Sequence, residues 1–362
     1  MRIVGLALLV TADFHIPLLH RTYPGNQPDG PTFAGLTAEL IDRHRRIAGQ
    51  VESVTLIFDK GNCSADNLGA LEDSPYHFIS SLVPTHHPEL LAIPARRFRS
   101  LAADGLPRVR AYRTTKEVFG VERTVVVTYN EALFVAQSRT LLREIAKRQQ
   151  QLSELQARLV RHQKGEVRGG KRPTMAGVRK TIDGYLKARH MKELFAIDLG
   201  ERAGVPALSY EFRTAAWRDL QRTLLGKTIL FTDQGSWSDA EIVRGYRGQH
   251  QVESAFRCLK SPYHMSLRPQ RHWTDQKIRV HVFYCVLALL LCSLLRRQLH
   301  RQGIDRSIPA LLEELAAIRE VGALTAGEGE GEPPRLEMTL SQLTEGQRRL
   351  YDALDLGRYV SP

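Results

Sequence analysis

The sequence predicts an α/β fold, because strand, helix and strand patterns alternate near its N-terminus. Residues 2–11 and about 16–20 are typical of a strand hairpin with its turn at 12–14. A helix pattern follows to about Ala48, and the apolar, β-branched residues 53–58 then indicate a strand of the fully buried kind. Functional groups in such sheets lie beyond the carboxyl ends of the strands, and Asp59 follows directly after this strand.

The connection between the hairpin and the helix is predicted to be a loop, because residues 23–31 are dense in Pro, Gly, Asn and Asp. Either Thr32 or Thr37 can cap the helix that follows. Its inner face is expected to carry Leu36, Leu40, Ile41 and Ile47.

The middle of the chain begins with strand-like segments at about 76–83, 108–113 and 121–128 and continues into a long helix at about 131–163. The surface of this helix is rich in Arg, Lys and Gln, and its apolar residues lie near heptad spacing. That spacing fits either a partner helix or a returning segment of the same chain, since about three heptads are few for an independent coiled coil. The apolar positions are Leu141, Leu142, Ile145, Leu152, Leu155 and Leu159.

A basic, glycine-containing stretch at 165–180 carries Lys171 and Arg172. It fits a flexible solvated loop or a contact with a phosphate backbone, and the pattern does not decide between them. Residues at about 194–199, 207–214 and 227–232 are expected to form the strands of a small sheet.

A helix bearing Glu253 is predicted to start at a capping box, with Ser238 as the cap and Glu241 three residues later. At helical spacing one side of this helix carries Tyr246, Gln249 or His250, Glu253, Arg257 and Lys260, and the opposite side carries Val252, Ala255, Phe256 and Leu259. A carboxylate among cations suits a divalent metal beside a phosphate backbone. On spacing alone, a solvated helix with a Glu253–Arg257 ion pair is the alternative.

The charge balance favours a polyanionic partner, because 51 Lys and Arg residues face 39 Asp and Glu residues, a formal net charge of +12. Such a partner is nucleic acid or an anionic membrane surface. The apolar run 280–295 is short for a membrane span, contains His281 and suits a buried core helix. Residues 1–11 resemble a signal peptide only in part, since no small-residue cleavage site follows them. The four cysteines show no metal-binding spacing, which fits reduced thiols in a cytosolic protein.

Several segments in collinear order resemble the DDE insertion-sequence transposases with an RNase H-like catalytic core. Tyr246, Glu253 and Lys260 match their Y-x2-R-x3-E-x6-K signature. Further similar segments are 24–29, 57–62, 66–68, 232–233, 241–243, 268–269 and 279–281, so that the resemblance covers roughly residues 1–300.

This resemblance implies catalytic and metal-binding roles for Glu253, the terminal acidic ligand, and Asp59, the second aspartate. It implies two divalent ions, Mg²⁺ or Mn²⁺, held by three carboxylates: one activates water or a DNA 3′-hydroxyl, the other stabilises the leaving oxygen. The expected DNA-binding residues are Tyr246, Arg247, Gln249, Arg257, Lys260, Lys171 and Arg172. The signature arginine is Gln249 here, which weakens the expected binding of transposon ends, and Arg257 is the candidate that compensates.

The implied organisation places the N-terminal part of the core at 1–75 and a mixed helical and β insertion, including helix 131–163, at 76–235. The C-terminal part of the core follows at 236–300, and then a linker, with 326–334 rich in Gly and Pro, and a peripheral appendage at 301–362. The family's first catalytic aspartate lies on a strand upstream of the hairpin, and neither Asp13 nor Asp29 lies in a core strand. We therefore expect a core without its first strand, from a truncated or misannotated reading frame.

The expected function is that of a bacterial insertion-sequence transposase, an enzyme that cleaves DNA and transfers strands at terminal inverted repeats, defective as written. The alternative is a non-catalytic DNA-binding remnant or an inhibitor of the full-length enzyme. Expected partners are double-stranded DNA, as transposon ends and target, and a second copy of the chain in a synaptic homodimer. We expect a cytoplasmic, nucleoid-associated protein without a membrane partner; a membrane-associated basic protein is a third interpretation that depends on residues 280–295.

Overall fold

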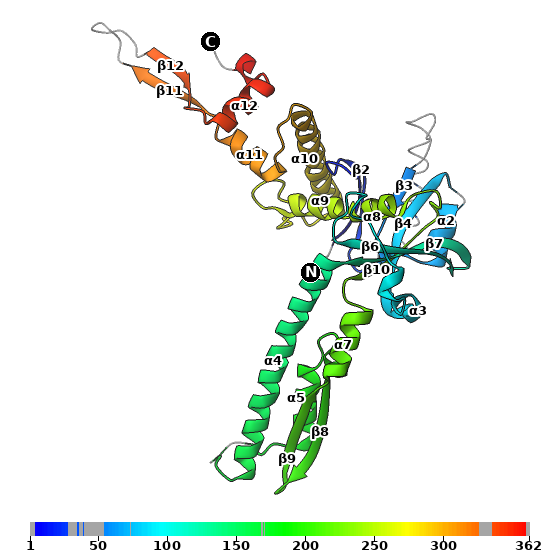
Figure 1. The fold of residues 1–362 in the computed structure, drawn as a ribbon. Coiled ribbons are helices and arrows are strands. Elements are labelled where there is room, and N and C mark those ends of the chain that lie inside the picture. Colours follow the sequence, from blue (N-terminus) through cyan, green and yellow to red (C-terminus); the bar gives the residue numbers. More distant parts are fainter. Residues whose placement is uncertain are drawn as a thin grey trace. The chain divides into compact units, whose positions relative to one another are not determined.

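The computed structural model describes residues 4–27, 35, 39, 54–72, 74–167, 169, 171–325 and 335–359 (Figure 1). The chain forms two compact units: unit 1 is Met1–Tyr76 with Arg244–Pro362, and unit 2 is His77–Val243. Most of the helix predicted to end near Ala48, together with Asp29 and the linker 326–334, lies outside the described residues.

Unit 1 begins with the predicted hairpin, in which β1 (Val4–Val10) and β2 (Pro17–Pro24) pair antiparallel as a two-stranded sheet. Its turn contains Phe14 and His15 with φ of 58° and 43°, both in the left-handed region. The predicted strand before Asp59 is β3 (Val54–Ile57), followed by the short helix η1 (Lys60–Asn62) and by α2 (Ala65–Glu72).

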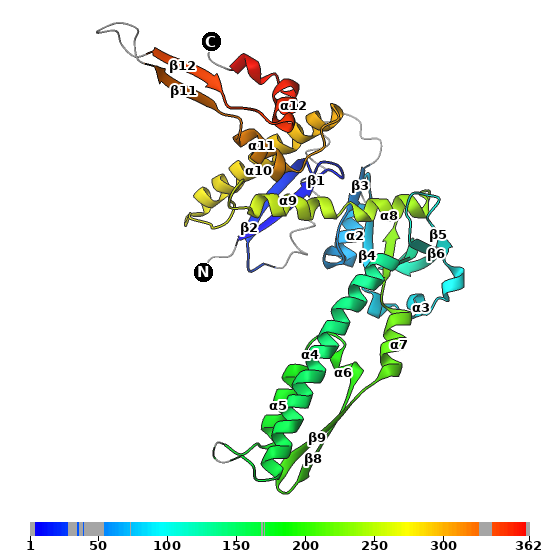
Figure 2. The same ribbon diagram turned by 60° about the vertical axis from the view of Figure 1, so that its left-hand side comes forward.

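The core of unit 1 forms where α9 (His250–Lys260) and α10 (Asp275–Arg301) pack against each other and against the hairpin, α9 on β1 and α10 on β2. Figure 2 shows both helices lying beside the hairpin. The buried residues of this cluster are Ala255, Cys258, Leu259, Met265, Val282, Cys285, Val286, Leu289 and Ile308.

The C-terminal part of unit 1 comprises α11 (Ile308–Ala316), the antiparallel pair β11 (Glu320–Thr325) and β12 (Arg335–Leu340), α12 (Glu345–Ala353) and η4 (Leu356–Tyr359). Leu350 of α12 is fully buried in a second cluster with Leu299, Ile304 and Leu311. The segment expected to be a peripheral appendage therefore contributes to a core at the end of α10.

Helix α10 contains the apolar run 280–295 and extends beyond it at both ends. In the described part of the chain it is the one helix long and apolar enough to cross a membrane by length and composition, with 33% of its most apolar window buried. One face enters the unit 1 core through Val282, Val286 and Leu289, as expected of a core helix, while Phe283 and Leu291 on other faces are exposed.

In unit 2, five strands pair antiparallel in the order β4-β10-β7-β6-β5. They are β4 (Tyr76–Leu82), β5 (Arg99–Ser100), β6 (Val109–Val118), β7 (Val121–Asn130) and β10 (Lys227–Thr232). Three short helices, η2 (Pro84–His86), α3 (Pro88–Leu91) and η3 (Ala95–Arg97), connect β4 to β5.

The prediction that 227–232 belongs to a small sheet with 194–199 and 207–214 is wrong. Strand β10 pairs with β4 and β7, whereas β8 (Phe195–Arg202) and β9 (Val205–Phe212) form a separate antiparallel pair. The reason is visible in consecutive residues of β10: Ile229, Leu230 and Phe231 are all buried, which requires a central strand covered on both faces.

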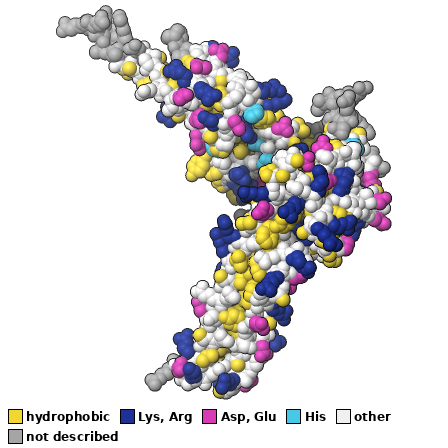
Figure 3. Space-filling model, viewed as in Figure 1, with side chains coloured by type: hydrophobic (Ala, Val, Ile, Leu, Met, Phe, Trp, Pro, Cys, Tyr) yellow, Lys and Arg dark blue, Asp and Glu magenta, His cyan; other side chains and the backbone are white. Residues whose placement is uncertain are grey.

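The rest of unit 2 is an arm, residues 131–223, in which α4 (Glu131–Gln163) lies beside α5 (Met175–Tyr185) and the β8–β9 pair in both views (Figures 1 and 2). The arm also contains α6 (Met191–Leu194) and α7 (Thr214–Thr223). On the face shown in Figure 3, hydrophobic side chains gather along the arm between Lys and Arg side chains.

The long helix packs against its own return. Its heptad residues Ile145, Leu152, Leu155 and Leu159 are buried with α5, α6, β8 and β9, through Val178, Ile182, Leu186, Met191, Leu194, Phe195, Val205 and Leu208. Two α4 side chains also bind β9: Gln156 Nε2 donates to Leu208 O at 2.9 Å and Gln163 Nε2 donates to Pro206 O at 2.9 Å.

Candidate active site

Asp59 is held at the end of β3 with its side chain in solvent. Phe58 before it is buried, so the strand is anchored up to the residue that carries the carboxylate. Asp59 then serves as the N-cap of η1 with extended backbone and makes no side-chain capping bond. The carboxylate is thus exposed at a defined point of the backbone and retains the capacity to bind a cation.

The loop after Asp59 is fixed by Asn67, which is buried on α2. Its Nδ2 donates to Asn62 O at 2.9 Å, and its backbone N–H donates to Ser64 Oγ at 3.2 Å. The Asn62 N–H in turn donates to Asp59 O at 2.9 Å. The segment similar to the family's D-R/K-G region is therefore a hydrogen-bonded turn that sets the direction in which Asp59 leaves the strand.

Glu253 lies in the first turn of α9, where its carboxylate is exposed. The opposite face of the helix is closed by Ala255 and Leu259, both fully buried, and by Phe256, which packs against the same cluster. Val252 is only half-buried. Helix α9 therefore has the predicted apolar inner face and charged outer face.

The continuous helix predicted from the capping box to Lys260 is wrong, because it is interrupted at Gly248 and Gln249. The capping box is present: the Ser238 N–H donates to Glu241 Oε2 at 2.7 Å, and it opens α8 (Asp239–Arg247). The physical reason is local: Gly248 has low helix propensity, and its N–H donates to Gly245 O at 2.8 Å in a tightened last turn of α8. A Cβ on Gly248 would lie 2.9 Å from Gly245 O and, at an ordinary contact distance of 3.7 Å, from Ile57 Cδ1. Tyr246 therefore belongs to a different helix from Glu253.

The approach of Ile57 to Gly248 also places the elements that carry the two candidate carboxylates beside each other. Ile57 ends β3 two residues before Asp59, and Gly248 lies at the start of the segment that leads to Glu253. Within the described ranges, no three His, Cys, Asp or Glu side chains gather into a metal site. Asp59 and Glu253 supply hard, exposed carboxylate oxygens, a donor set that suits Mg²⁺ or Mn²⁺.

His15 connects the hairpin turn to α9. The side chain is buried, and its Nδ1 donates to Gln251 Oε1 at 3.2 Å. Burial lowers the pKa of His15 below its ordinary value, so the ring is held neutral at physiological pH. The hairpin turn and the helix that carries Glu253 are therefore joined by a neutral hydrogen bond.

The predicted DNA-binding residues around Glu253 differ in accessibility. Arg257, Lys260 and Arg247 are exposed, and Lys260 Nζ lies 5.3 Å from the centre of the Phe256 ring. The alternative of a Glu253–Arg257 ion pair is not seen in the described part of the chain, whose ion pairs involve other side chains. Both charges therefore remain directed at solvent, where a metal and a phosphate can reach them.

Gln249, at the position of the signature arginine, is half-buried in the junction between α8 and α9. Among the described residues no partner accepts from its buried Nε2. An unpaired buried amide costs about 1–3 kcal/mol.

Lys171 and Arg172 lie in the other unit, in the arm. Both are exposed, and Arg172 Nη2 donates to Ala203 O at 3.1 Å in the turn between β8 and β9. Ala203 and Gly204 have φ of 54° and 67°, as a two-residue hairpin turn requires. Arg172 thus supports this turn with one donor, which leaves its other N–H groups for an anion.

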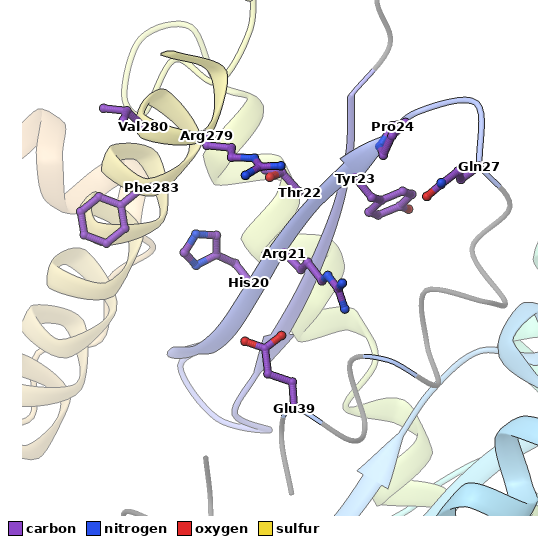
Figure 4. Close-up of a pocket in the computed structure, with 10 residues that line it drawn as sticks. All are labelled: His20, Arg21, Thr22, Tyr23, Pro24, Gln27, Glu39, Arg279, Val280 and Phe283. Carbon is purple, nitrogen blue, oxygen red and sulfur yellow. The ribbon is translucent and has the colours of Figure 1, made fainter. Parts of the chain in front are cut away.

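A basic hollow in unit 1 was missed from the sequence. It has a volume of about 790 Å³ and lies between β2 and the first turns of α10 (Figure 4). Arg21 and Arg279 contribute cations from the two sides. No sequence signal separates these two arginines from the other 49 basic residues, because only the packing of α10 beside β2 brings them together. The other lining residues are His20, Thr22, Tyr23, Pro24, Gln27, Glu39, Val280 and Phe283.

Asp233 follows β10 directly, where a sheet can present a catalytic carboxylate, yet its side chain serves the fold. Its Oδ1 accepts from the Phe78 N–H at 2.8 Å, and its Oδ2 accepts from His77 Nδ1 at 3.0 Å. These bonds fasten the end of β10 to β4, so Asp233 is a structural residue of unit 2.

Comparison with known proteins gives one family. The model of the family described as "Transposase DDE domain" matches residues 3–291, which include β1, Asp59, the whole of unit 2 and Glu253. No curated protein and no solved structure matches the chain.

Proposed function

Because the chain belongs to the transposase DDE domain family, we propose that it cuts DNA at the ends of a bacterial insertion sequence and joins those ends to a target. The observation that carries this proposal is the exposed Glu253 carboxylate on α9, beside the exposed cations Arg257 and Lys260 and opposite a buried face. A helix built in this way presents a metal ligand and phosphate ligands from one rigid surface.

Asp59 and Glu253 are the residues proposed to hold Mg²⁺ or Mn²⁺, with a further carboxylate completing the set. When bound, the metal would promote attack by water or a 3′-hydroxyl on a phosphodiester and stabilise the charge that develops there. Arg257 and Lys260 would neutralise phosphates on either side of that bond. The hydrogen bonds of Asn67 would keep the Asp59 loop in one conformation as DNA enters.

Recognition of the ends is proposed to use Tyr246, Arg247 and Gln249, together with the basic hollow of Arg21 and Arg279 in unit 1. Lys171 and Arg172 are proposed to contact a phosphate backbone from the arm. Two copies of the chain would hold the two ends in a synaptic homodimer on chromosomal DNA.

The test is nicking of a supercoiled plasmid by the purified full chain in MgCl₂ or MnCl₂. Glu253→Gln keeps the side chain's shape and removes its charge, so we expect nicking to fall on the order of 100-fold or more. Glu313→Gln is the matched control, because Glu313 is an exposed helical glutamate of the same unit. Equal nicking by parent and Glu253→Gln chains would overturn the assignment.

A second candidate function is occupation of DNA ends without cleavage, which would inhibit an active transposase. Arg257, Lys260 and the basic hollow favour it, because exposed cations bind phosphates whether or not carboxylates hold a metal. A gel shift that survives the Asp59→Ala and Glu253→Ala substitutions, with no nicking by the parent chain, would support this second function over the first.

A further inference from the structure

The segment 261–274, between α9 and α10, exposes two large aromatic side chains. Tyr263 is 91% exposed and Trp273 is 79% exposed. Tryptophan is rarely so accessible, because burying its ring is among the larger hydrophobic gains available to a side chain. We call residues 261–274 the aromatic loop.

The exposure of Tyr263 follows from how the loop is anchored. The Leu267 N–H donates to Leu259 O at 2.9 Å and the Ser266 N–H donates to Ser261 O at 2.9 Å, which closes a tight turn at the end of α9. Met265 fills the unit 1 core, and its carbonyl accepts from the Cys285 thiol at 3.0 Å. With Met265 directed into the core, Tyr263 lies on the outer side of the same turn.

Trp273 is fixed at the other end of the loop. It directly precedes Thr274, whose Oγ1 accepts from the Lys277 N–H at 3.4 Å and caps α10. Nearby, the rings of His272 and His281 stack edge to face with their centres 5.2 Å apart. The backbone on both sides of Trp273 is therefore anchored while most of its side chain surface is exposed.

The sequence around the two rings is strongly cationic. Residues 257–279 contain six Lys and Arg residues and one carboxylate, Asp275. Those in the loop, Arg268 and Arg271, are exposed. The six are Arg257, Lys260, Arg268, Arg271, Lys277 and Arg279.

We propose that the aromatic loop binds unpaired nucleotides of a DNA strand, with Tyr263 and Trp273 stacking on bases and the arginines contacting phosphates. Aromatic rings interleaved with cations are the combination that single-stranded DNA requires, since each base offers a flat face and each phosphate a charge. Duplex DNA hides those faces, so the rings discriminate in favour of unpaired bases. The inference rests on the proposed function only for the presence of DNA; it adds a contact to unpaired bases at the C-terminal end of the helix that carries Glu253.

Fluorescence of Trp273 tests the stacking directly, in EDTA so that no cleavage occurs. In the Trp217→Phe, Trp237→Phe chain, the remaining indole should be quenched by a dT oligonucleotide and not by a duplex of equal length. Tyr263→Ala and Trp273→Ala should each weaken binding to the single strand about 5- to 150-fold, which is ~1–3 kcal/mol, and change duplex binding less than about twofold. Trp273→Phe should restore most of the affinity.

Tyr284→Ala is the matched control, because Tyr284 is an aromatic residue 63% exposed on α10 outside the loop. The proposal is overturned if Trp273 is not quenched, if the control loses as much affinity, or if single strand and duplex are weakened equally. These outcomes are separate from the nicking test: failure of stacking leaves nicking by the parent chain intact, and failure of nicking leaves stacking in EDTA intact.

Discussion

The arm offers a stringent test of how the long helix is stabilised, through two leucines of α4 that the heptad pattern treats alike. Leu152 is fully buried against the returning segments, whereas Leu142 is 50% exposed. Replacing either by alanine leaves the helix propensity nearly unchanged. The two substitutions therefore differ mainly in the contacts that each leucine makes.

The expected magnitudes follow from burial. Leu152→Ala should lower the free energy of unfolding of the arm by about 3–5 kcal/mol, because neighbours in a closed cluster cannot fill the cavity. Leu142→Ala should cost about 1 kcal/mol or less, since half of its side chain already contacts water. A loss of the larger size is a substantial fraction of the total stability of a typical domain, about 5–15 kcal/mol.

Urea unfolding can be followed through Trp217, which packs against the buried cluster of the arm. In the Trp237→Phe, Trp273→Phe chain it is the one remaining indole. The midpoint should shift strongly for Leu152→Ala and little for Leu142→Ala, with the slope against urea unchanged. Both midpoints should be independent of protein concentration, because the arm's stabilising contacts lie within one chain.

Equal losses from the two substitutions would refute this reasoning. The reasoning would also be refuted if the midpoint rose with protein concentration and Leu142→Ala lowered the stability more than Leu152→Ala. That combination would mean that α4 pairs with a helix of another chain, which is the alternative that heptad spacing left open.

Three further predictions concern unit 1. Asn67→Ala removes the donor to Asn62 O and should lower stability by about 1–2 kcal/mol in urea, with nicking reduced more than DNA binding because the Asp59 loop loosens. Gln249→Arg should tighten DNA binding and steepen the slope of log K against log salt by about 0.9, measured by fluorescence anisotropy; an unchanged slope would count against a phosphate contact there. Burial lowers the pKa of His15 below its ordinary 6.5, so the unfolded chain takes up the proton first and stability should fall as the pH drops below 6.5; His15→Gln should flatten that dependence.

Local signals predicted much of the chain correctly. The hairpin, the strand before Asp59, the capping box at Ser238 and the long helix each depend on residues near one another in sequence, through alternation, capping and helical periodicity. The family resemblance is confirmed by the family match, and it rested on short motifs of the same local kind.

Features that depend on distant residues were not predictable in this way. The pairing of β10 with β4 and β7 depends on those two distant strands. The sequence of β10 alone is equally compatible with a strand of a small sheet. The sequence of the helix likewise gives no sign that Gly248 lies beside Ile57, nearly two hundred positions earlier, where a Cβ would be 3.7 Å from Ile57 Cδ1. The hollow of Arg21 and Arg279 likewise needs α10 beside β2.

A backbone hydrogen bond joins the aromatic loop to the end of α9, the helix that carries Glu253, so the two proposals are linked by the geometry of one element. Leu267 bonds to Leu259 at the end of the helix that carries Glu253, and Met265 is held by Cys285 of α10. A base stacked on Tyr263 would therefore sit at a fixed offset from the Glu253 carboxylate, because neither the turn nor α9 can shift without breaking these bonds. A DNA end whose terminal bases are unpaired would then be positioned by its bases as well as by its phosphates. If so, Tyr263→Ala should slow nicking near a frayed end more than nicking within a duplex, and an equal effect on both would separate the loop from the site.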